Sequence, residues 1–223
     1  MTWEAVAGRL RKRGAAVAVP SLRELAADGP PYAEPMAEAV AAAAVSLGAE
    51  DVVVAGHSGA GPLLPAAGRA VAGRGLRTAA YLFVDAALPH PGRSRLASIH
   101  PAFRGRLADL LDGDYLPPWS EWFDPHALDA LLPEEELRDR FRAELDRVPM
   151  ALLREPLPDV AGWPDAPCGF LRLSRAYDGE EAEAARQGWA VASLHGTHLH
   201  AMVEPQSVVA ALVSMAGRLG VSL

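Results

Sequence analysis

Residues 51–61 read DVVVAGHSGAG, and this stretch decides how the rest of the chain is interpreted. Its first five residues form a short apolar run typical of a buried strand, and a helical pattern follows at residues 60–73. The glycine-rich turn between them has Ser58 at its centre. Small residues at such a turn let a strand and a helix approach closely and tolerate a strained backbone at the serine. The stretch therefore predicts a strand, a sharp turn and a helix that present Ser58 as a nucleophile.

The usual form of this motif is G-x-S-x-G, whereas this chain has Ala60 at the last position and a glycine one step later at Gly61. Alanine is small, so the departure is mild. We expect the backbone N–H of Gly59, at the start of the helix, to face the substrate oxygen and to supply one oxyanion donor. The competing interpretation is a turn that only connects strand and helix, or one that cradles a phosphate.

Strands and helices alternate on both sides of this turn. The apolar patterns predict helices at residues 3–10, 32–47, 180–186 and 205–219, and short apolar runs or strands at residues 15–19, 79–84, 169–173 and 190–194. Short apolar strands that alternate with helices indicate an α/β fold, with a mostly parallel sheet covered by helices on both faces.

Residues 90–158 break this alternation. They contain helical patterns and a proline- and aromatic-rich stretch, but no convincing strand. We interpret them as a helical cap inserted into an α/β core formed by residues 1–89 and 159–223. Four aromatic residues of the cap are candidates for covering an apolar substrate, although packing within the cap explains them equally well: Tyr115, Trp119, Trp122 and Phe123.

Three histidines follow the last predicted strand, in the sequence HGTHLH at residues 195–200. A general base for Ser58 must come from a loop at the same edge of the sheet, and this loop meets that need. We choose His198 as the base, with His200 as the alternative, and His57 is a candidate for shaping the substrate pocket. A metal site is the competing idea, but no acidic or cysteine ligand stands in a motif with these histidines, and zinc usually needs three or four protein ligands.

The serine turn and the loop in which His198 is followed by Pro205 resemble the α/β-hydrolase superfamily, over nearly the whole chain from Trp3 onward. In particular, the chain resembles the small esterase-like proteins of actinobacteria. Its use of arginine in place of lysine suits such a source, because Lys12 is the only lysine. The resemblance implies a serine nucleophile with a histidine base and an acid behind it.

In the superfamily the acid commonly follows the penultimate strand, and Asp178 lies a few residues past the strand predicted at residues 169–173. The chain order serine, aspartate, histidine then also fits. The alternative acid is Asp85, which ends the strand predicted at residues 79–84, a place that some members use. An aspartate there could equally well cap the following loop, and we favour Asp178.

The resemblance also predicts a missing piece. In the superfamily, a strand before the first helix lies inside the sheet, between those that match residues 15–19 and 51–55, and feeds the loop with the second oxyanion N–H. Here the first helix begins at about Trp3, so we expect that strand and loop to be absent. Either the two neighbouring strands pair directly, or a partner chain fills the gap, for example in a homodimer. The oxyanion hole would keep Gly59 and need a replacement donor, such as Ser21 or the cap.

The composition of the chain limits the kinds of binding partner that we expect. The net charge is −7 and the basic residues form no stripe, so nucleic acid is not an expected partner. No apolar run reaches the length of a membrane span and the first residues have no signal layout, so we expect a cytoplasmic protein without a membrane partner. Cys168 is the only cysteine, which excludes an internal disulfide and favours a buried packing role over a catalytic thiol.

Two functional hypotheses remain. The first is a serine hydrolase that acts on an ester, thioester or lactone of a small, mainly apolar metabolite, with no cofactor. The second is a non-hydrolytic protein of the same fold, a lyase, a cyclase or a small-molecule binder, whose oxyanion hole is incomplete. Fold alone does not choose between them. An epoxide hydrolase or dehalogenase of this fold would use an aspartate nucleophile, so Ser58 counts against both.

Overall fold

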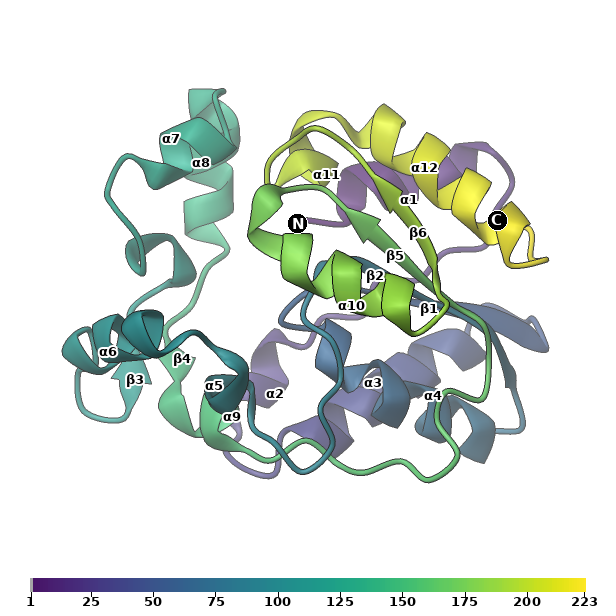
Figure 1. The fold of residues 1–223 in the computed structure, drawn as a ribbon, viewed down its shortest axis with the longest axis horizontal. Helices are drawn as coiled ribbons and strands as arrows, with labels where there is room; N and C mark the ends of the chain where they lie inside the picture. Colours follow the sequence, from purple (N-terminus) through teal and green to yellow (C-terminus); the bar gives the residue numbers. More distant parts are fainter. Residues whose placement is uncertain (1) are drawn as a thin grey trace.

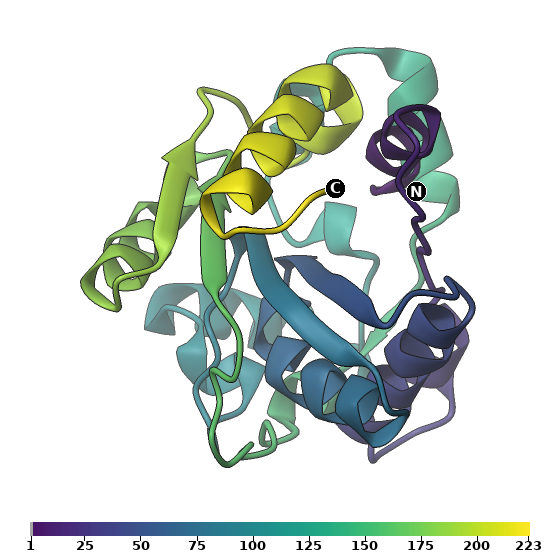
Figure 2. The ribbon, with the colours of Figure 1, turned by 90° about the vertical axis from the view of Figure 1, so that its right-hand side faces the viewer.

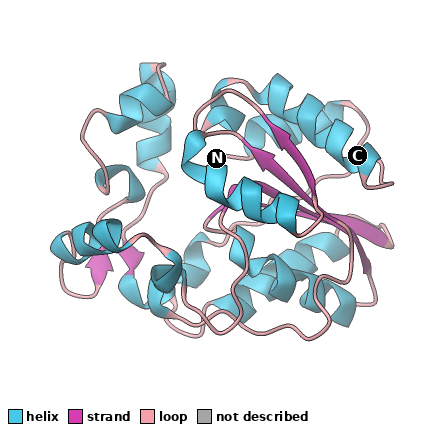
Figure 3. Ribbon diagram, viewed as in Figure 1, coloured by secondary structure: helices cyan, strands magenta, loops and turns pink. Residues whose placement is uncertain are grey.

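The computed structural model describes residues 2–223. Its central sheet has four parallel strands in the order β1-β2-β5-β6. The strands span Asp51–Ser58 (β1), Arg77–Ala86 (β2), Cys168–Arg172 (β5) and Ala190–Ser193 (β6). Helices lie on both sides of the sheet, as Figure 3 shows. The predicted α/β architecture with a mostly parallel sheet is therefore confirmed.

Two sets of helices cover the two faces of the sheet (Figure 1). One face packs against α3 (Ala33–Val45), α4 (Leu64–Gly73) and α10 (Asp178–Arg186), and the other against α1 (Glu4–Lys12), α11 (His200–Val203) and α12 (Pro205–Arg218). Side chains alternate between the faces of a strand. In the central strand β2, Tyr81 and Phe83 therefore belong to one core cluster and Leu82 and Val84 to the other. None of the helices in residues 2–223 is long and apolar enough to cross a bilayer.

Between β2 and β5 the chain leaves the sheet and forms short elements. These are α5 (Arg95–Ser98), α6 (Pro101–Asp109), β3 (Tyr115–Leu116), η2 (Trp119–Glu121), α7 (Ala127–Leu131), α8 (Glu135–Ala143), β4 (Val148–Pro149) and α9 (Met150–Arg154). The strands β3 and β4 pair antiparallel and were not expected, because two residues are too few for an alternating pattern. The remaining short elements are α2 (Arg23–Ala27), η1 (Gly61–Leu63) and η3 (Arg175–Tyr177).

The outer flank of β1 stays open. Residues 15–19 form no strand, and no backbone hydrogen bond joins them to β1 within the described chain. A cavity of about 800 Å³ separates the two segments and is lined mainly by apolar residues, among them Val17, Val19 and Val53. Figure 2 shows the N-terminal segment on this side of the sheet. The sheet thus does not close the gap by direct pairing, and the alternative, a partner chain in the gap, stays a prediction.

Candidate active site

The polar residues of the site gather at the carboxyl end of the sheet. Ser58 ends β1, Asp85 lies one residue before the end of β2, and His198 follows β6. The carboxyl ends of parallel strands meet at one edge, where open α/β sheets bind their ligands. Three segments far apart in the sequence are therefore brought to one place.

The turn after β1 has the geometry of a strained elbow. Ser58 has a φ of 57°, a left-handed conformation that few non-glycine residues adopt. A Cβ at Gly61 would collide with the carbonyl oxygen of Ala87, and one at Gly56 would lie 3.0 Å from Leu64. Gly56 thus lets β1 and the following helix approach each other, and Gly61 lets the turn pack against the end of β2. At Gly59, by contrast, an added Cβ would meet nothing within 4 Å.

A line of two hydrogen bonds joins the three side chains. Ser58 Oγ lies 2.9 Å from His198 Nε2, and His198 Nδ1 lies 2.8 Å from Asp85 Oδ2. A carboxylate only accepts hydrogen bonds, so Nδ1 carries the proton and Nε2 is left to accept the proton of Ser58. The His198 side chain is 12% exposed and that of Asp85 is fully buried, so water competes little for these bonds.

Asp85 remains a carboxylate inside the protein. Burial alone would raise its pKa, but hydrogen bonds from His198, from Ser174 and from the Leu173 backbone outweigh burial and hold the pKa below its ordinary value. The donors besides His198 are Leu173 N and Ser174 N, both at 2.8 Å, and Ser174 Oγ at 2.7 Å. A buried charge with four donors is well placed to orient the histidine and to stabilise its charged form.

Asp178, the acid favoured from the sequence, lies elsewhere. Its side chain is 61% exposed at the start of α10 and forms an ion pair with Arg172 at 3.2 Å. The acid that contacts His198 is the alternative, Asp85. The sequence did contain a signal for Asp85. An aspartate at the end of an apolar strand is buried with that strand, and a buried carboxylate needs hydrogen-bond partners.

Two rings stack on that of His198. The His57 ring lies at 4.5 Å between centroids, and His57 Nε2–H donates to the His198 carbonyl at 2.9 Å. Burial, and electrostatic repulsion from the neighbouring His198 imidazole, lower the pKa of His57 to about 3, so this donor stays neutral. The predicted pocket residue His57 therefore holds the histidine loop in place. The Tyr177 ring stacks on that of His198 at 5.3 Å with an interplanar angle of 13°.

Tyr177 was missed by the sequence analysis. Its hydroxyl lies 3.4 Å from Ser58 Oγ. It belongs to η3, in the loop between β5 and Asp178, and no motif marks a tyrosine there. The alternative base His200 is excluded by its surroundings, because its Nε2 lies 3.3 Å from Ser207 Oγ and its ring fills the space beside Gly196.

One of the four aromatic candidates of the insertion reaches the site. The Trp119 ring lies 5.9 Å from that of His198. Trp122 and Phe123 instead belong to the cluster of apolar side chains within the insertion. Tyr115 is 41% exposed and its ring lies under the guanidinium of an arginine. The interpretation as internal packing therefore holds for Trp122 and Phe123.

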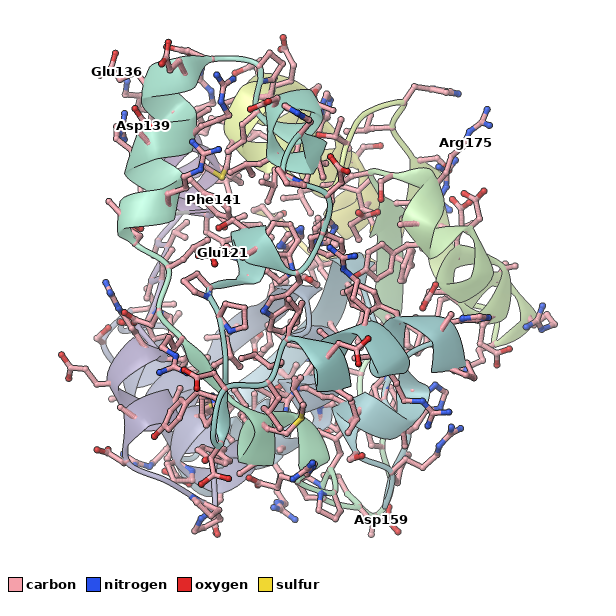
Figure 4. All side chains as sticks on the ribbon, turned by 90° about the vertical axis from the view of Figure 1, so that its left-hand side faces the viewer. Glu121, Glu136, Asp139, Phe141, Asp159 and Arg175 are labelled. Atoms are coloured by element: carbon pink, nitrogen blue, oxygen red, sulfur yellow. The ribbon has the colours of Figure 1, made fainter. Side chains whose placement is uncertain are left out.

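The insertion contacts both loops of the site. Arg95, at the start of α5, donates to the carbonyl oxygen of Gly59 at 3.1 Å. Thr197 donates to the carbonyl oxygen of Leu131 in α7 at 3.3 Å. In Figure 4, which faces the insertion, Phe141 marks α8, whose apolar residues pack in one cluster with the start of α11. The insertion thus contacts the turn that carries Ser58 and the loop that carries His198, and fixes them relative to each other.

The remaining titratable candidates form no second centre. In the part of the chain that the structure describes, no group of three or more His, Cys, Asp or Glu side chains is arranged to hold a metal ion. Cys168 is buried at the start of β5, and burial raises the pKa of its thiol to about 12. A thiol with that pKa is not a thiolate nucleophile at neutral pH.

Comparison with known proteins was informative at the level of structure. No family model matches the sequence, and no curated protein matches it. An extracellular α/β-hydrolase from a Paenibacillus species is similar with a TM-score of 0.75 at 19% identity, over 96% of this chain and 93% of that one. Tomato methylketone synthase I gives 0.67 at 16% identity (98% and 93% covered), and polyneuridine aldehyde esterase 0.62 at 15% (96% and 93%). Together with the sheet order and the serine elbow, these similarities show that the chain has the α/β-hydrolase fold.

Proposed function

We propose that the chain is a serine hydrolase that cleaves an ester, thioester or lactone of a small, mainly apolar metabolite. The observation that carries the proposal is the hydrogen-bonded line from Ser58 through His198 to Asp85, with distances of 2.9 and 2.8 Å. Asp85 takes the role that the sequence analysis gave to Asp178. The strained turn at Ser58 supports the same role, because such strain is concentrated at functional sites.

Each residue has one task in this mechanism. Ser58 Oγ attacks the acyl carbonyl carbon while its proton passes to His198 Nε2. Asp85 keeps the proton on Nδ1 and stabilises the imidazolium that forms. The Gly59 N–H, which donates no hydrogen bond within residues 2–223, is free to donate to the developing oxyanion. His198 then protonates the leaving group, and a water molecule repeats the sequence to release the acid.

The surroundings of the site favour a small apolar substrate. Trp119 lies beside His198, and the neighbouring residue Leu199 is buried among apolar side chains of the insertion. The His198 side chain is only 12% exposed, so little of the proposed catalytic ring is open to water. Ester cleavage is also in the name of one of the similar structures, polyneuridine aldehyde esterase.

A second candidate is a non-hydrolytic role, as a lyase, a cyclase or a small-molecule binder. The observation that favours it is the open flank of β1, where residues 15–19 do not pair with the strand and a cavity separates the two segments. Another similar structure is named a synthase. The fold supports both candidates, so activity has to choose between them.

Hydrolysis of p-nitrophenyl butyrate, together with labelling by a fluorophosphonate probe, tests the proposal. The wild type is expected to hydrolyse the ester and to be labelled. Ser58→Ala and His198→Ala are expected to lose labelling and about 10⁴-fold or more in kcat. A folded wild-type protein that shows neither activity nor labelling would contradict the proposal and favour the non-hydrolytic candidate.

A further inference from the structure

A tetrahedral oxyanion is usually held by two donors, and at the elbow the Gly59 N–H donates no hydrogen bond within residues 2–223. Ser21, a candidate replacement, is exposed, and its hydroxyl accepts a hydrogen bond from the Arg23 N–H at 3.5 Å. Within residues 2–223, the side-chain hydroxyl hydrogen-bonded to Ser58 Oγ belongs to Tyr177, at 3.4 Å. The Tyr177 phenol is therefore the candidate for the second donor to the oxyanion.

The backbone holds Tyr177 firmly. Ser174, three residues earlier, gives both its N–H and its hydroxyl to Asp85. The Tyr177 N–H in turn donates to the Ser174 carbonyl at 3.3 Å. The Tyr177 ring lies parallel to that of His198, so its hydroxyl and His198 Nε2 face the same serine oxygen. The same carboxylate thus orients the base and anchors the segment that carries the phenol.

From this geometry we infer that Tyr177 is a catalytic hydrogen-bond donor, whose O–H stabilises the oxyanion together with the Gly59 N–H. The inference rests on the proposed function. In the resting site the phenol donates to a Ser58 lone pair over 3.4 Å, longer than an ordinary O–H···O bond. When Oγ attacks, His198 takes the proton, the O–H bond pair stays on oxygen, and one oxygen lone pair becomes the new C–O bond. The carbonyl oxygen beside it gains negative charge at that moment, so the phenol hydrogen bond shifts from Oγ to the oxyanion.

This switch favours the transition state over the ground state, which is what accelerates a reaction. No proton leaves the phenol: the Ser58 proton goes to His198, and the oxyanion only accepts a hydrogen bond. Burial raises the pKa of Tyr177 to about 12, so the hydroxyl keeps its proton throughout the pH range in which such an enzyme works. A phenol of this kind is a dependable donor.

Tyr177→Phe tests the inference, because it removes the hydroxyl and keeps the ring that stacks on His198. We expect kcat for p-nitrophenyl butyrate to fall about 10²-fold, as for the loss of one oxyanion donor, with little change in KM. Binding of octyl trifluoromethyl ketone, which forms an oxyanion adduct with the serine, should weaken by a similar factor. The corresponding methyl ketone, which only occupies the site, should bind equally well to both proteins.

The matched control is Tyr32→Phe, which removes a phenolic hydroxyl from the buried cluster beside α3 and should leave kcat unchanged. Wild-type kcat in Tyr177→Phe would overturn the inference and leave the proposed function standing. So would equal weakening of both ketones, which would indicate that the residue only shapes the pocket. A wild type that neither hydrolyses the ester nor reacts with a fluorophosphonate would overturn the proposed function and the inference together.

Discussion

The two borders of β1 differ sharply. At its carboxyl end, Ser58 joins a network in which His198 and Asp85 have partners at 2.7–2.9 Å. Along its outer flank, the same strand faces a cavity of about 800 Å³, and residues 15–19 opposite it make no backbone hydrogen bond to it. We call the hydrogen-bonded carboxyl end of β1 the closed border and the outer flank beside the cavity the open border.

The hydrogen bonds that hold Ser58, His198 and Asp85 together come from the inner side of β1. The charged and polar side chains of the site are fixed by β2, β5 and β6 on the inner side of β1, and by the insertion above them. Along the outer flank, no backbone hydrogen bond joins residues 15–19 to β1. Perturbations at the closed border should therefore change chemistry, and those at the open border should change little.

The largest expected effect separates Asp85 from Asp178. In Asp85→Asn, the amide cannot keep the proton on His198 Nδ1 as a carboxylate does, and loss of this group in a serine triad costs about 10⁴ in kcat. Asp178→Asn removes only an exposed ion pair, whose partner Arg172 keeps Glu181 at 2.8 Å, so kcat should change by less than about twofold. Ester hydrolysis by both variants is the measurement.

Asp85 is buried and accepts four hydrogen bonds, so circular dichroism and thermal unfolding must first show that Asp85→Asn is folded. A large loss in Asp178→Asn with wild-type activity in Asp85→Asn would reverse the assignment. In that case the acid favoured from the sequence would be correct, and the hydrogen bond of Asp85 would be structural.

The sequence was sufficient for the parts of the site that depend on local pattern. The strand–turn–helix signal around residues 51–61 predicted the elbow, and the position of residues 195–200 after the last strand predicted that His198 lies against Ser58. Each of these depends on a few adjacent residues. The parallel sheet followed from apolar runs, which are local as well.

The acid and Tyr177 could not be predicted in the same way. Asp85 and Asp178 both follow strands, and only the packing of β5 against β2 decides which carboxylate lies against the histidine. The roles of the insertion's aromatic residues depend on how that segment folds back over the sheet, which no periodicity encodes. Contacts between residues far apart in the sequence decide these roles, and only the tertiary structure shows such contacts.

The second expected effect compares two neighbouring valines of β1 on opposite faces of the sheet. Both side chains line the cavity, but Val54 is 5% exposed and packs in the cluster formed with α3 and α4, whereas Val53 is only partly buried. Val54→Ala should lower the free energy of unfolding by about 2 kcal/mol, since it removes contacts from a packed core cluster. Val53→Ala should cost about 1 kcal/mol or less, because that side chain loses less buried area.

Urea unfolding of both variants measures this difference. An equal or larger cost for Val53→Ala would mean that the flank is filled in solution, as the prediction of a partner chain or a homodimer requires. Sedimentation of the wild type over a range of concentrations would then test whether a second copy is the occupant. In a dimer, the apparent stability measured by unfolding would also depend on concentration.

The smallest expected effect is a pH dependence at the closed border. The folded protein lowers the pKa of His57 from 6.5 to about 3. At pH values between these two, His57 is protonated in the unfolded chain and neutral in the folded protein. Stability must then fall as the pH falls through this window. From about pH 7 to about pH 5.5 the loss due to His57 is about 1 kcal/mol.

His57→Gln should remove this loss, because an amide can still donate to the His198 carbonyl but does not titrate. The wild type and the variant are therefore expected to differ in the slope of unfolding free energy against pH, with the variant less sensitive to acid. His126→Gln is the control, since that side chain is 88% exposed and should leave the slope unchanged. Equal slopes for the wild type and His57→Gln would show that the His57 ring also takes up a proton in the folded state. The hydrogen bond to the His198 carbonyl would then not depend on a neutral imidazole.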